Sequence, residues 1–272
     1  MPELNNPVLP RMFYRKMGSG PVMVLLHGFP ENGLLWRNIW DKLCGSFTLI
    51  VPDFPGSGNT PLENETDIAQ MADMVKEILD YEKVDSAIIA GHSMGGYVAL
   101  AFAGSYPAMI KGISLVHSTP VADDVEKKKA RLKSAELIRK GGKELFIMQM
   151  VPNLFSDAFK QSNPLMVKAQ TEEALKTSSD GLINFCDAMR LRNDSRAMLK
   201  TAGFPVQWII GLDDNIMSYK KILIESHQSD INFVTFYREC GHMSMIEAPE
   251  RLARDMEIFG RYCQKSEYRV YV

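Results

Sequence analysis

Six short runs of apolar and β-branched residues recur along the chain, and a helical pattern separates each run from the next. The runs lie at 22–26, 47–51, 86–90, 112–116, 206–210 and 231–236. Because they are continuously apolar rather than alternating, they are typical of strands that are buried on both faces. Strands that alternate with helices predict a doubly wound, mostly parallel α/β sheet, whose ligands bind at the carboxyl ends of the strands.

The intervening helices are predicted at 34–43, 66–84, 95–105, 218–227 and 248–263. The second of these has one apolar face, and Thr66 or Asp67 is placed to cap its start. The segment 11–17 is expected to form an antiparallel strand at the edge of the sheet, which would contain about eight strands.

The alternation stops between residues 120 and 200, where the sequence is helical in character and contains no convincing strand. We therefore predict an α/β core formed by residues 1–119 and 201–272. A helical cap, residues 120–200, would be inserted into this core before the strand at 206–210.

Composition excludes several kinds of partner. With 272 residues, 46% of them apolar, the chain can bury a large core, and its net charge of −2 gives no reason to expect nucleic acid. No apolar run is long enough to span a bilayer, and the first residues lack the apolar centre of a secretory signal. We expect a cytoplasmic protein with a small-molecule partner, and the sequence leaves open whether it forms a homo-oligomer. The scattered cysteines are expected to be reduced thiols rather than disulfides or zinc ligands: Cys44, Cys186, Cys240 and Cys263.

The most informative motif follows the predicted strand at 86–90. Gly91, Ser93 and Gly95 form G-x-S-x-G, and a predicted helix begins directly afterwards. A serine in such a sharp turn holds a strained backbone that presents its hydroxyl, and side chains in place of the glycines would clash with neighbouring backbone. The motif therefore predicts a nucleophilic serine at the carboxyl edge of the sheet.

Such a serine needs a general base, and His242 is the best placed of the five histidines, because it follows the last strand in a loop before a helix. His92 is expected to pack at the serine turn, His27 to hold its own loop and His117 to line a pocket. His227 is expected to be a solvated helix end.

The negatively charged oxygen that forms when serine attacks an ester needs two backbone N–H donors. Met94, at the start of the helix after the serine, is one candidate. The other is Phe29 in "HGFPE", a loop that follows the strand at 22–26. A carboxylate that orients the base could come from Asp213 or Asp214, which end the stretch "QWIIGLDD".

Together these motifs resemble the α/β-hydrolase fold superfamily, in its cap-bearing serine esterase, lactonase and haloperoxidase-like branch. The resemblance is carried by "HGFP" (27–30), "DFPGSGNT" (53–60), "GHSMGG" (91–96), "GLDD" (211–214) and "GHM" (241–243). It implies a nucleophile, an acid and a base in that chain order, and Ser93 and His242 fit the first and last places. Asp214, three residues after Gly211, matches the place of the acid, with Asp213 or an acid after another strand as alternatives.

The resemblance implies a serine hydrolase that cleaves a small carboxylic ester, thioester or lactone and needs no cofactor or metal. Relatives that use an aspartate nucleophile do not match, because Ser93 stands at that position. Carbon–carbon bond hydrolases are disfavoured by His92, although Arg190 and Arg192 could anchor the substrate carboxylate that such enzymes require. Two further alternatives are a cofactor-free perhydrolase or haloperoxidase-like enzyme, and a ligand-binding receptor or regulator with little turnover.

The predicted cap carries apolar residues that could line a pocket for a hydrophobic substrate, and any one of them could equally be structural. They are Phe146, Met148, Met150, Leu154, Phe155, Phe159, Met166, Phe185 and Met189. The basic stretch at 127–133 could dock an acidic carrier or a membrane surface. A solvated helix face is the favoured interpretation, because nearby acids dilute the charge.

Overall fold

The computed structural model describes residues 9–265, and seven strands form a single sheet among them in the order β1-β3-β2-β4-β5-β6-β7. Only β1 is antiparallel to its neighbour, and every other pair is parallel. The strands are β1 (Tyr14–Gly18), β2 (Val22–Leu26), β3 (Thr48–Pro52), β4 (Ala87–His92), β5 (Ile110–Val116), β6 (Val206–Gly211) and β7 (Asn232–Tyr237). The predicted doubly wound α/β sheet and its antiparallel edge strand are confirmed. Residues 1–8 and 266–272, the outer ends of the predicted core, lie outside the described residues.

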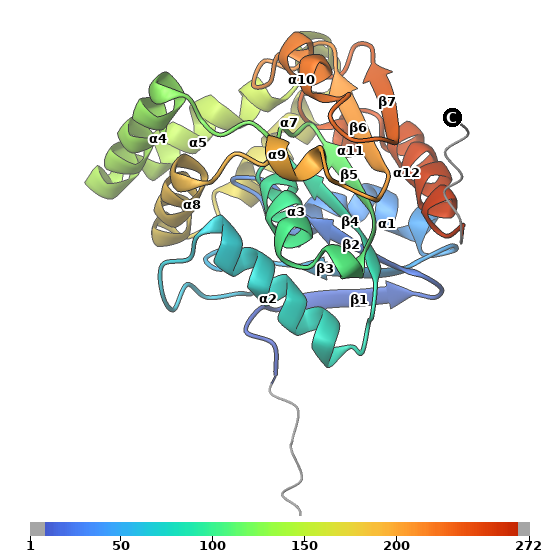
Figure 1. The fold of residues 1–272 in the computed structure, drawn as a ribbon. Coiled ribbons are helices and arrows are strands. Elements are labelled where there is room, and N and C mark those ends of the chain that lie inside the picture. Colours follow the sequence, from blue (N-terminus) through green and yellow to red (C-terminus); the bar gives the residue numbers. More distant parts are fainter. Residues whose placement is uncertain (1–8, 266–272) are drawn as a thin grey trace, which may run out of the picture.

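Helices cover both faces of the sheet (Figure 1). On one face α2 (Ile68–Tyr81) packs against α3 (Met94–Ser105), and on the other α1 (Arg37–Leu43) packs against α12 (Pro249–Cys263). Two shorter helices, α10 (Tyr219–Glu225) and α11 (Ser244–Glu247), follow β6 and β7. Asp67, rather than Thr66, caps α2: its side chain accepts the backbone N–H of Gln70, whose side chain accepts the N–H of Asp67 in return.

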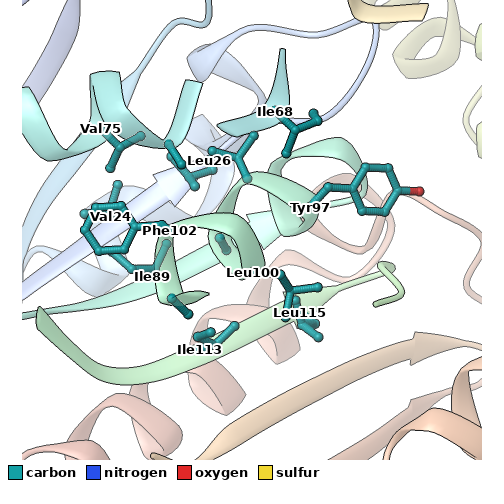
Figure 2. Packing of buried hydrophobic residues seen from close by; sticks show 14 of the residues in the cluster. Val24, Leu26, Ile68, Val75, Ile89, Tyr97, Leu100, Phe102, Ile113 and Leu115 are labelled. Carbon is teal, nitrogen blue, oxygen red and sulfur yellow. The ribbon is translucent and has the colours of Figure 1, made fainter. Parts of the chain in front are cut away.

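Side chains of the central strands alternate between the two faces, although both faces are apolar. Val24 and Leu26 of β2 and Ile89 of β4 point toward α2 and α3, where Figure 2 shows them among the buried apolar side chains. Met23 and Leu25 point to the opposite face and pack with residues of α1 and α12. Burial on both faces explains why the strands read as continuous apolar runs in the sequence.

Between β5 and β6 the chain forms helices and no strand. Six α-helices lie there: α4 (Val125–Leu137), α5 (Lys143–Met150), α6 (Asp157–Ser162), α7 (Pro164–Ala174), α8 (Ser179–Leu191) and α9 (Arg196–Leu199). A wider turn at Ile138–Gly142 separates α4 from α5, and Gly141 has a φ of 89°, which suits glycine. Among residues 9–265, every helix is too short or too polar to cross a lipid bilayer.

The loop after β2 is tied to this helical region by a buried carboxyl group. Glu31 is 1% exposed, and the side chain of Gln170 in α7 donates a hydrogen bond to it. Nearby, the hydroxyl of Thr177 donates to the carbonyl of Pro30 at 2.9 Å. Burial raises the pKa of Glu31 to about 8, so the side chain is largely protonated at neutral pH.

This buried group should make stability depend on pH. Since the folded pKa lies above the unfolded value, the stabilisation is complete below about pH 4.5 and is lost as pH rises to about 8. Glu31→Gln, which resembles the protonated form, should match the wild type near pH 5 and exceed its unfolding free energy by a few kcal/mol near pH 8. Urea denaturation of both proteins at several pH values measures this, with the exposed Glu65→Gln as control; parallel pH profiles for wild type and Glu31→Gln would contradict it.

Candidate active site

Ser93 lies in the turn between β4 and α3, with φ of 49° and ψ of −112°. A non-glycine residue rarely adopts this conformation, and such strain is found mainly where function requires it. The turn is held in place because the backbone N–H of Ser93 donates to the carbonyl of Val116 at 2.9 Å and the Ser118 hydroxyl donates to the carbonyl of Ser93 at 2.8 Å. Both partners come from the end of the adjacent strand, β5, or directly after it.

The glycines on either side of Ser93 permit the close backbone approach that the motif predicts. A β-carbon on Gly95 would lie 2.3 Å from the carbonyl oxygen of Leu26, and one on Gly91 would lie 2.3 Å from the carbonyl of Gly95. Either distance is a clash with backbone that cannot move aside. The expectation that side chains at these positions would clash is therefore confirmed.

Asp214 and His242 meet at the same edge of the sheet. His242 Nδ1 lies 2.7 Å from Asp214 Oδ2, and both side chains are buried. The other carboxylate oxygen, Oδ1, accepts the backbone N–H groups of Ile216 and Met217 at 2.8 and 2.9 Å. Burial alone would raise the pKa of Asp214, but His242 and His117 beside it and their hydrogen bonds hold that pKa well below its usual range. Asp213 is exposed to solvent and takes no part in this arrangement.

His117 is a second neighbour of Asp214 that the sequence did not reveal. Its Nδ1 lies 3.4 Å from Asp214 Oδ2, and its side chain is fully buried. The expectation that His117 lines a pocket is wrong for the cavity at Ser93, because His117 is not among the residues that border it. Burial lowers the pKa of His117, which favours a neutral ring. Its place directly after β5, at the same sheet edge, is the sequence signal that could have identified it.

The atoms of His117, Asp214 and His242 that could bind a metal ion all lie within 4.8 Å of one another. Ligand atoms about 2 Å from a tetrahedral zinc ion lie roughly 3.3 Å apart. The 2.7 Å contact between Asp214 and His242 is shorter and matches a hydrogen bond. These residues therefore fit proton handling better than a metal site.

The backbone of His242 is fixed from both sides. Its N–H donates to the carbonyl of Leu154 at 2.7 Å, and its carbonyl accepts from His92 Nε2 at 2.9 Å. Burial lowers the pKa of His92 well below its usual value, so the ring is neutral. His92 packs at the serine turn as predicted. Its hydrogen bond to His242 was not predicted from the sequence.

Glu247 joins the His242 loop to the helical region. Its carboxylate accepts the backbone N–H groups of Gly241 at 3.0 Å, Met243 at 3.1 Å and Ser156 at 3.1 Å. The first two flank His242, and Ser156 lies between β5 and β6 in sequence. One carboxylate thus fixes the position of the histidine relative to the segment that covers it.

The two predicted oxyanion donors are the backbone N–H groups of Met94 and Phe29. Met94 begins α3, where helix geometry leaves the first N–H groups without an intrahelical acceptor, and Phe29 lies in the loop after β2. Neither N–H finds a backbone acceptor within residues 9–265. His27 holds the Phe29 loop as predicted, since its Nε2 accepts the N–H of Phe54 at 2.9 Å while burial lowers its pKa to about 4.

A cavity of about 240 Å³ borders both Ser93 and His242. Phe29, Tyr97 and Met217 line it from the core, and the helical region between β5 and β6 supplies most of the remaining wall. A separate hollow of about 310 Å³ lies on the far side of Tyr97 and reaches neither Ser93 nor His242. We assign the site to the smaller cavity, because only this one contains groups that can attack a substrate.

The predicted pocket residues divide into three groups. Phe146, Met150, Leu154 and Met189 line the cavity. Met148 and Met166 are 56% and 42% exposed and contribute nothing to it. The remaining three belong to apolar packing away from the cavity: Phe155, Phe159 and Phe185. Which face of each helix turns inward depends on packing that the sequence pattern does not encode.

The charged residues of the helical region are also arranged differently from expectation. Arg190 pairs with Asp187 at 2.8 Å and Arg192 with Asp123 at 2.8 Å, so neither reaches the cavity and their proposed role as carboxylate anchors is wrong. Two residues of the basic stretch, Lys127 and Arg131, line the cavity instead. Lys127 is nevertheless exposed to solvent, as the solvated-face interpretation predicts, whereas Arg131 is half-buried.

The cysteines form no disulfide, and Cys186 lines the cavity beside Ser93. All four are free thiols, and Cys240, beside Gly241 and His242, is buried. Burial raises the pKa of the Cys240 thiol, so it is not a nucleophile at neutral pH.

A strained serine between a strand and a helix, a paired aspartate and histidine, and a mostly parallel sheet with helices on both faces are features of the α/β-hydrolase fold. A family model described as the alpha/beta hydrolase fold matches residues 21–249. The chain therefore belongs to the α/β-hydrolase fold family.

Solved structures and curated relatives agree with this membership. A thermophilic esterase from Thermogutta terrifontis, solved with malate bound, has a TM-score of 0.89 and 25% identity over 93% of this chain and 94% of that one. An enol-lactonase from Burkholderia xenovorans shares the fold with a TM-score of 0.84 and 20% identity, over 91% of this chain and 95% of that one.

Among curated proteins, a pimeloyl-[acyl-carrier protein] methyl ester esterase of Pseudoalteromonas atlantica is 24% identical over 89% of this chain and 95% of its own length. An uncharacterized protein of Mycobacterium tuberculosis is 34% identical over 116 residues. That match covers 42% of this chain and only 34% of the relative, about a third of its length.

Proposed function

We propose that the protein is a serine hydrolase that cleaves a small carboxylic ester, thioester or lactone through an acyl-enzyme. The observation that carries this proposal is the 2.7 Å contact between Asp214 and His242 at a cavity that the strained Ser93 also borders. Relatives described as esterases and a lactonase support the class of reaction. In this proposal residues 120–200 act as the cap, and the substrate is a small, largely apolar ester.

In the proposed mechanism the Ser93 hydroxyl oxygen attacks the carbonyl carbon of the ester while its proton passes to His242 Nε2. The carbonyl oxygen becomes an oxyanion and accepts hydrogen bonds from the N–H groups of Phe29 and Met94. When the tetrahedral intermediate collapses, His242 returns the proton to the leaving alcohol. Water then attacks the carbonyl carbon of the acyl-enzyme while His242 accepts its proton. When this second intermediate collapses, His242 returns the proton to Ser93 and the acid is released.

Asp214 would act by orienting the base. Because it accepts a hydrogen bond from Nδ1 of His242, the proton of the neutral ring stays on that nitrogen and Nε2 remains free to accept the serine proton. The carboxylate would also stabilise the positive charge of His242 after transfer. Its own orientation is fixed by the N–H groups of Ile216 and Met217.

Labelling with a fluorophosphonate and turnover of a short-chain chromogenic ester test the proposal. The wild type should form a covalent adduct on Ser93, identified by peptide mass, and should turn over many equivalents of ester. Ser93→Ala should do neither. A wild type that neither labels nor turns over would refute the hydrolase proposal, and one that labels but turns over only a few molecules would indicate a ligand-binding receptor.

A further inference from the structure

The cavity beside Ser93 has basic side chains on one wall. Lys127 and Arg131 line it from α4, one helical turn apart, and within the described part of the chain no aspartate or glutamate borders it. The other walls are mainly apolar, with Phe29, Met150 and Met189 among them. A cavity with cationic groups on one side and no anionic group is matched to a ligand that carries negative charge.

Arg131 is only partly neutralised by its protein partner. Asp123 binds its Nε, and the same carboxylate pairs with Arg192 at 2.8 Å, so one buried negative charge serves two guanidinium groups. Across residues 9–265, no acceptor is found for the two terminal nitrogens of Arg131. Those nitrogens keep their hydrogen-bonding capacity for a group in the cavity.

Lys127 has no ion pair of its own with any residue from 9 to 265. Lys127 as a whole is exposed, but partial burial lowers its pKa, and the attraction of Asp123 opposes this shift while the nearby Arg131 and Arg192 reinforce it. Asp124 is exposed, and its carboxylate accepts the backbone N–H of Lys127 at 2.8 Å as the cap of α4. Lys127, Arg131 and Arg192 carry three positive charges against the two negative charges of Asp123 and Asp124, so the group behind the α4 wall keeps a net positive charge, and Lys127 and Arg131 are its members that border the cavity.

We propose that Lys127, together with the terminal nitrogens of Arg131, binds a carboxylate carried by the substrate. The preferred substrate is then a small ester with an ionised carboxylate remote from the bond that is cleaved, such as the half-ester of a short dicarboxylic acid. The ester carbonyl lies at Ser93, the aliphatic part lies against the apolar wall, and the carboxylate lies against α4. This inference rests on the proposed hydrolase function and narrows its substrate from a largely apolar ester to one whose far end is ionised.

The dimensions of the cavity favour this arrangement. Its volume of about 240 Å³ is at the small end for a ligand pocket, so one ligand that reaches Ser93 can also approach α4. Lys127 also borders an adjoining groove of about 200 Å³, which includes Lys221 and Glu225. Lys127 therefore borders both hollows.

Two esters of nearly equal shape test the proposal: the monomethyl ester of glutaric acid, which is anionic, and its neutral terminal carboxamide. The readout is the ratio of kcat/KM for the carboxylate ester to kcat/KM for the carboxamide ester, from methanol release. The wild-type ratio should be about ten or more, and in Lys127→Gln it should fall by about tenfold, mainly through KM. Lys128→Gln, at an exposed neighbouring position outside the cavity, should keep the wild-type ratio.

The outcome that would overturn the proposal is a wild-type ratio of one or less, or a ratio that Lys127→Gln leaves unchanged. A calorimetric titration with glutaramate, which carries one carboxylate, and with neutral glutaramide decides the matter independently of turnover. Glutaramate should bind the wild type more tightly than it binds Lys127→Gln, by about tenfold, and glutaramide should bind both weakly. If the wild type hydrolyses neither ester, fluorophosphonate labelling and turnover of the chromogenic ester still decide the proposed hydrolase function, and the titration still tests anion binding. Absence of glutaramate binding to the wild type would refute the carboxylate site.

Discussion

Replacing His242 with glutamine should lower kcat for ester hydrolysis by about 10⁴-fold or more. Glutamine cannot take the proton of Ser93, so the hydroxyl remains a weak nucleophile even though it stays in its strained turn. The N–H of residue 242 can still donate to the carbonyl of Leu154, because that bond uses only the backbone. Initial rates at saturating chromogenic ester measure the loss.

A double variant shows whether the serine and the histidine act as one unit. Ser93→Ala combined with His242→Gln should be no slower than the slower single variant, since either change alone already disables the shared proton transfer. His227→Gln, at an exposed histidine, should keep wild-type turnover. Losses that multiply in the double variant would show that the two residues act independently.

The sheet could be predicted because its signal is local. Each central strand is buried on both faces, which leaves a continuous apolar run such as 22–26, and the run is visible without any knowledge of its neighbours. The turn at Ser93 is equally local, because the glycines at 91 and 95 are required by contacts of the turn itself and of the adjacent β2.

The supporting contacts of the site could not be predicted in the same way. His117 and Glu247 reach Asp214 and the His242 loop from separate segments, and the carbonyl of Leu154 comes from the helical region. Each contact depends on how loops at the sheet edge pack together, which no spacing in the sequence specifies. The carboxyl ends of β5, β6 and β7 converge there, so the general region could be expected while the partners could not.

The orientation of the basic stretch of α4 could not be predicted from the sequence either. Lys127 and Arg131 are four residues apart and share a helical face, yet the sequence does not indicate whether that face is solvated or turned inward. In the structure both residues border the cavity beside Ser93, and Asp123, which also pairs with Arg192, binds the Nε of Arg131.

Replacing Asp214 with asparagine should lower kcat by about 10⁴-fold while leaving the fold intact. The reason lies in the two oxygens of the carboxylate. Oδ1 accepts the N–H groups of Ile216 and Met217, so the amide oxygen of asparagine would take that place and its NH₂ group would face His242. An NH₂ donor requires Nδ1 of His242 to accept, which moves the ring proton to Nε2, the nitrogen that must accept the proton of Ser93.

The neighbouring carboxylate provides the control for this prediction. Asp213 is exposed, and only its backbone N–H is engaged, by the carbonyl of Cys240 at 3.1 Å, so Asp213→Asn should change kcat by less than about twofold. Thermal denaturation of both variants separates loss of folding from loss of turnover. A large loss of kcat in Asp213→Asn with little loss in Asp214→Asn would show that Asp213, and not Asp214, orients His242. Comparable losses at both positions would instead show that the charge of the loop matters more than the tautomer of His242.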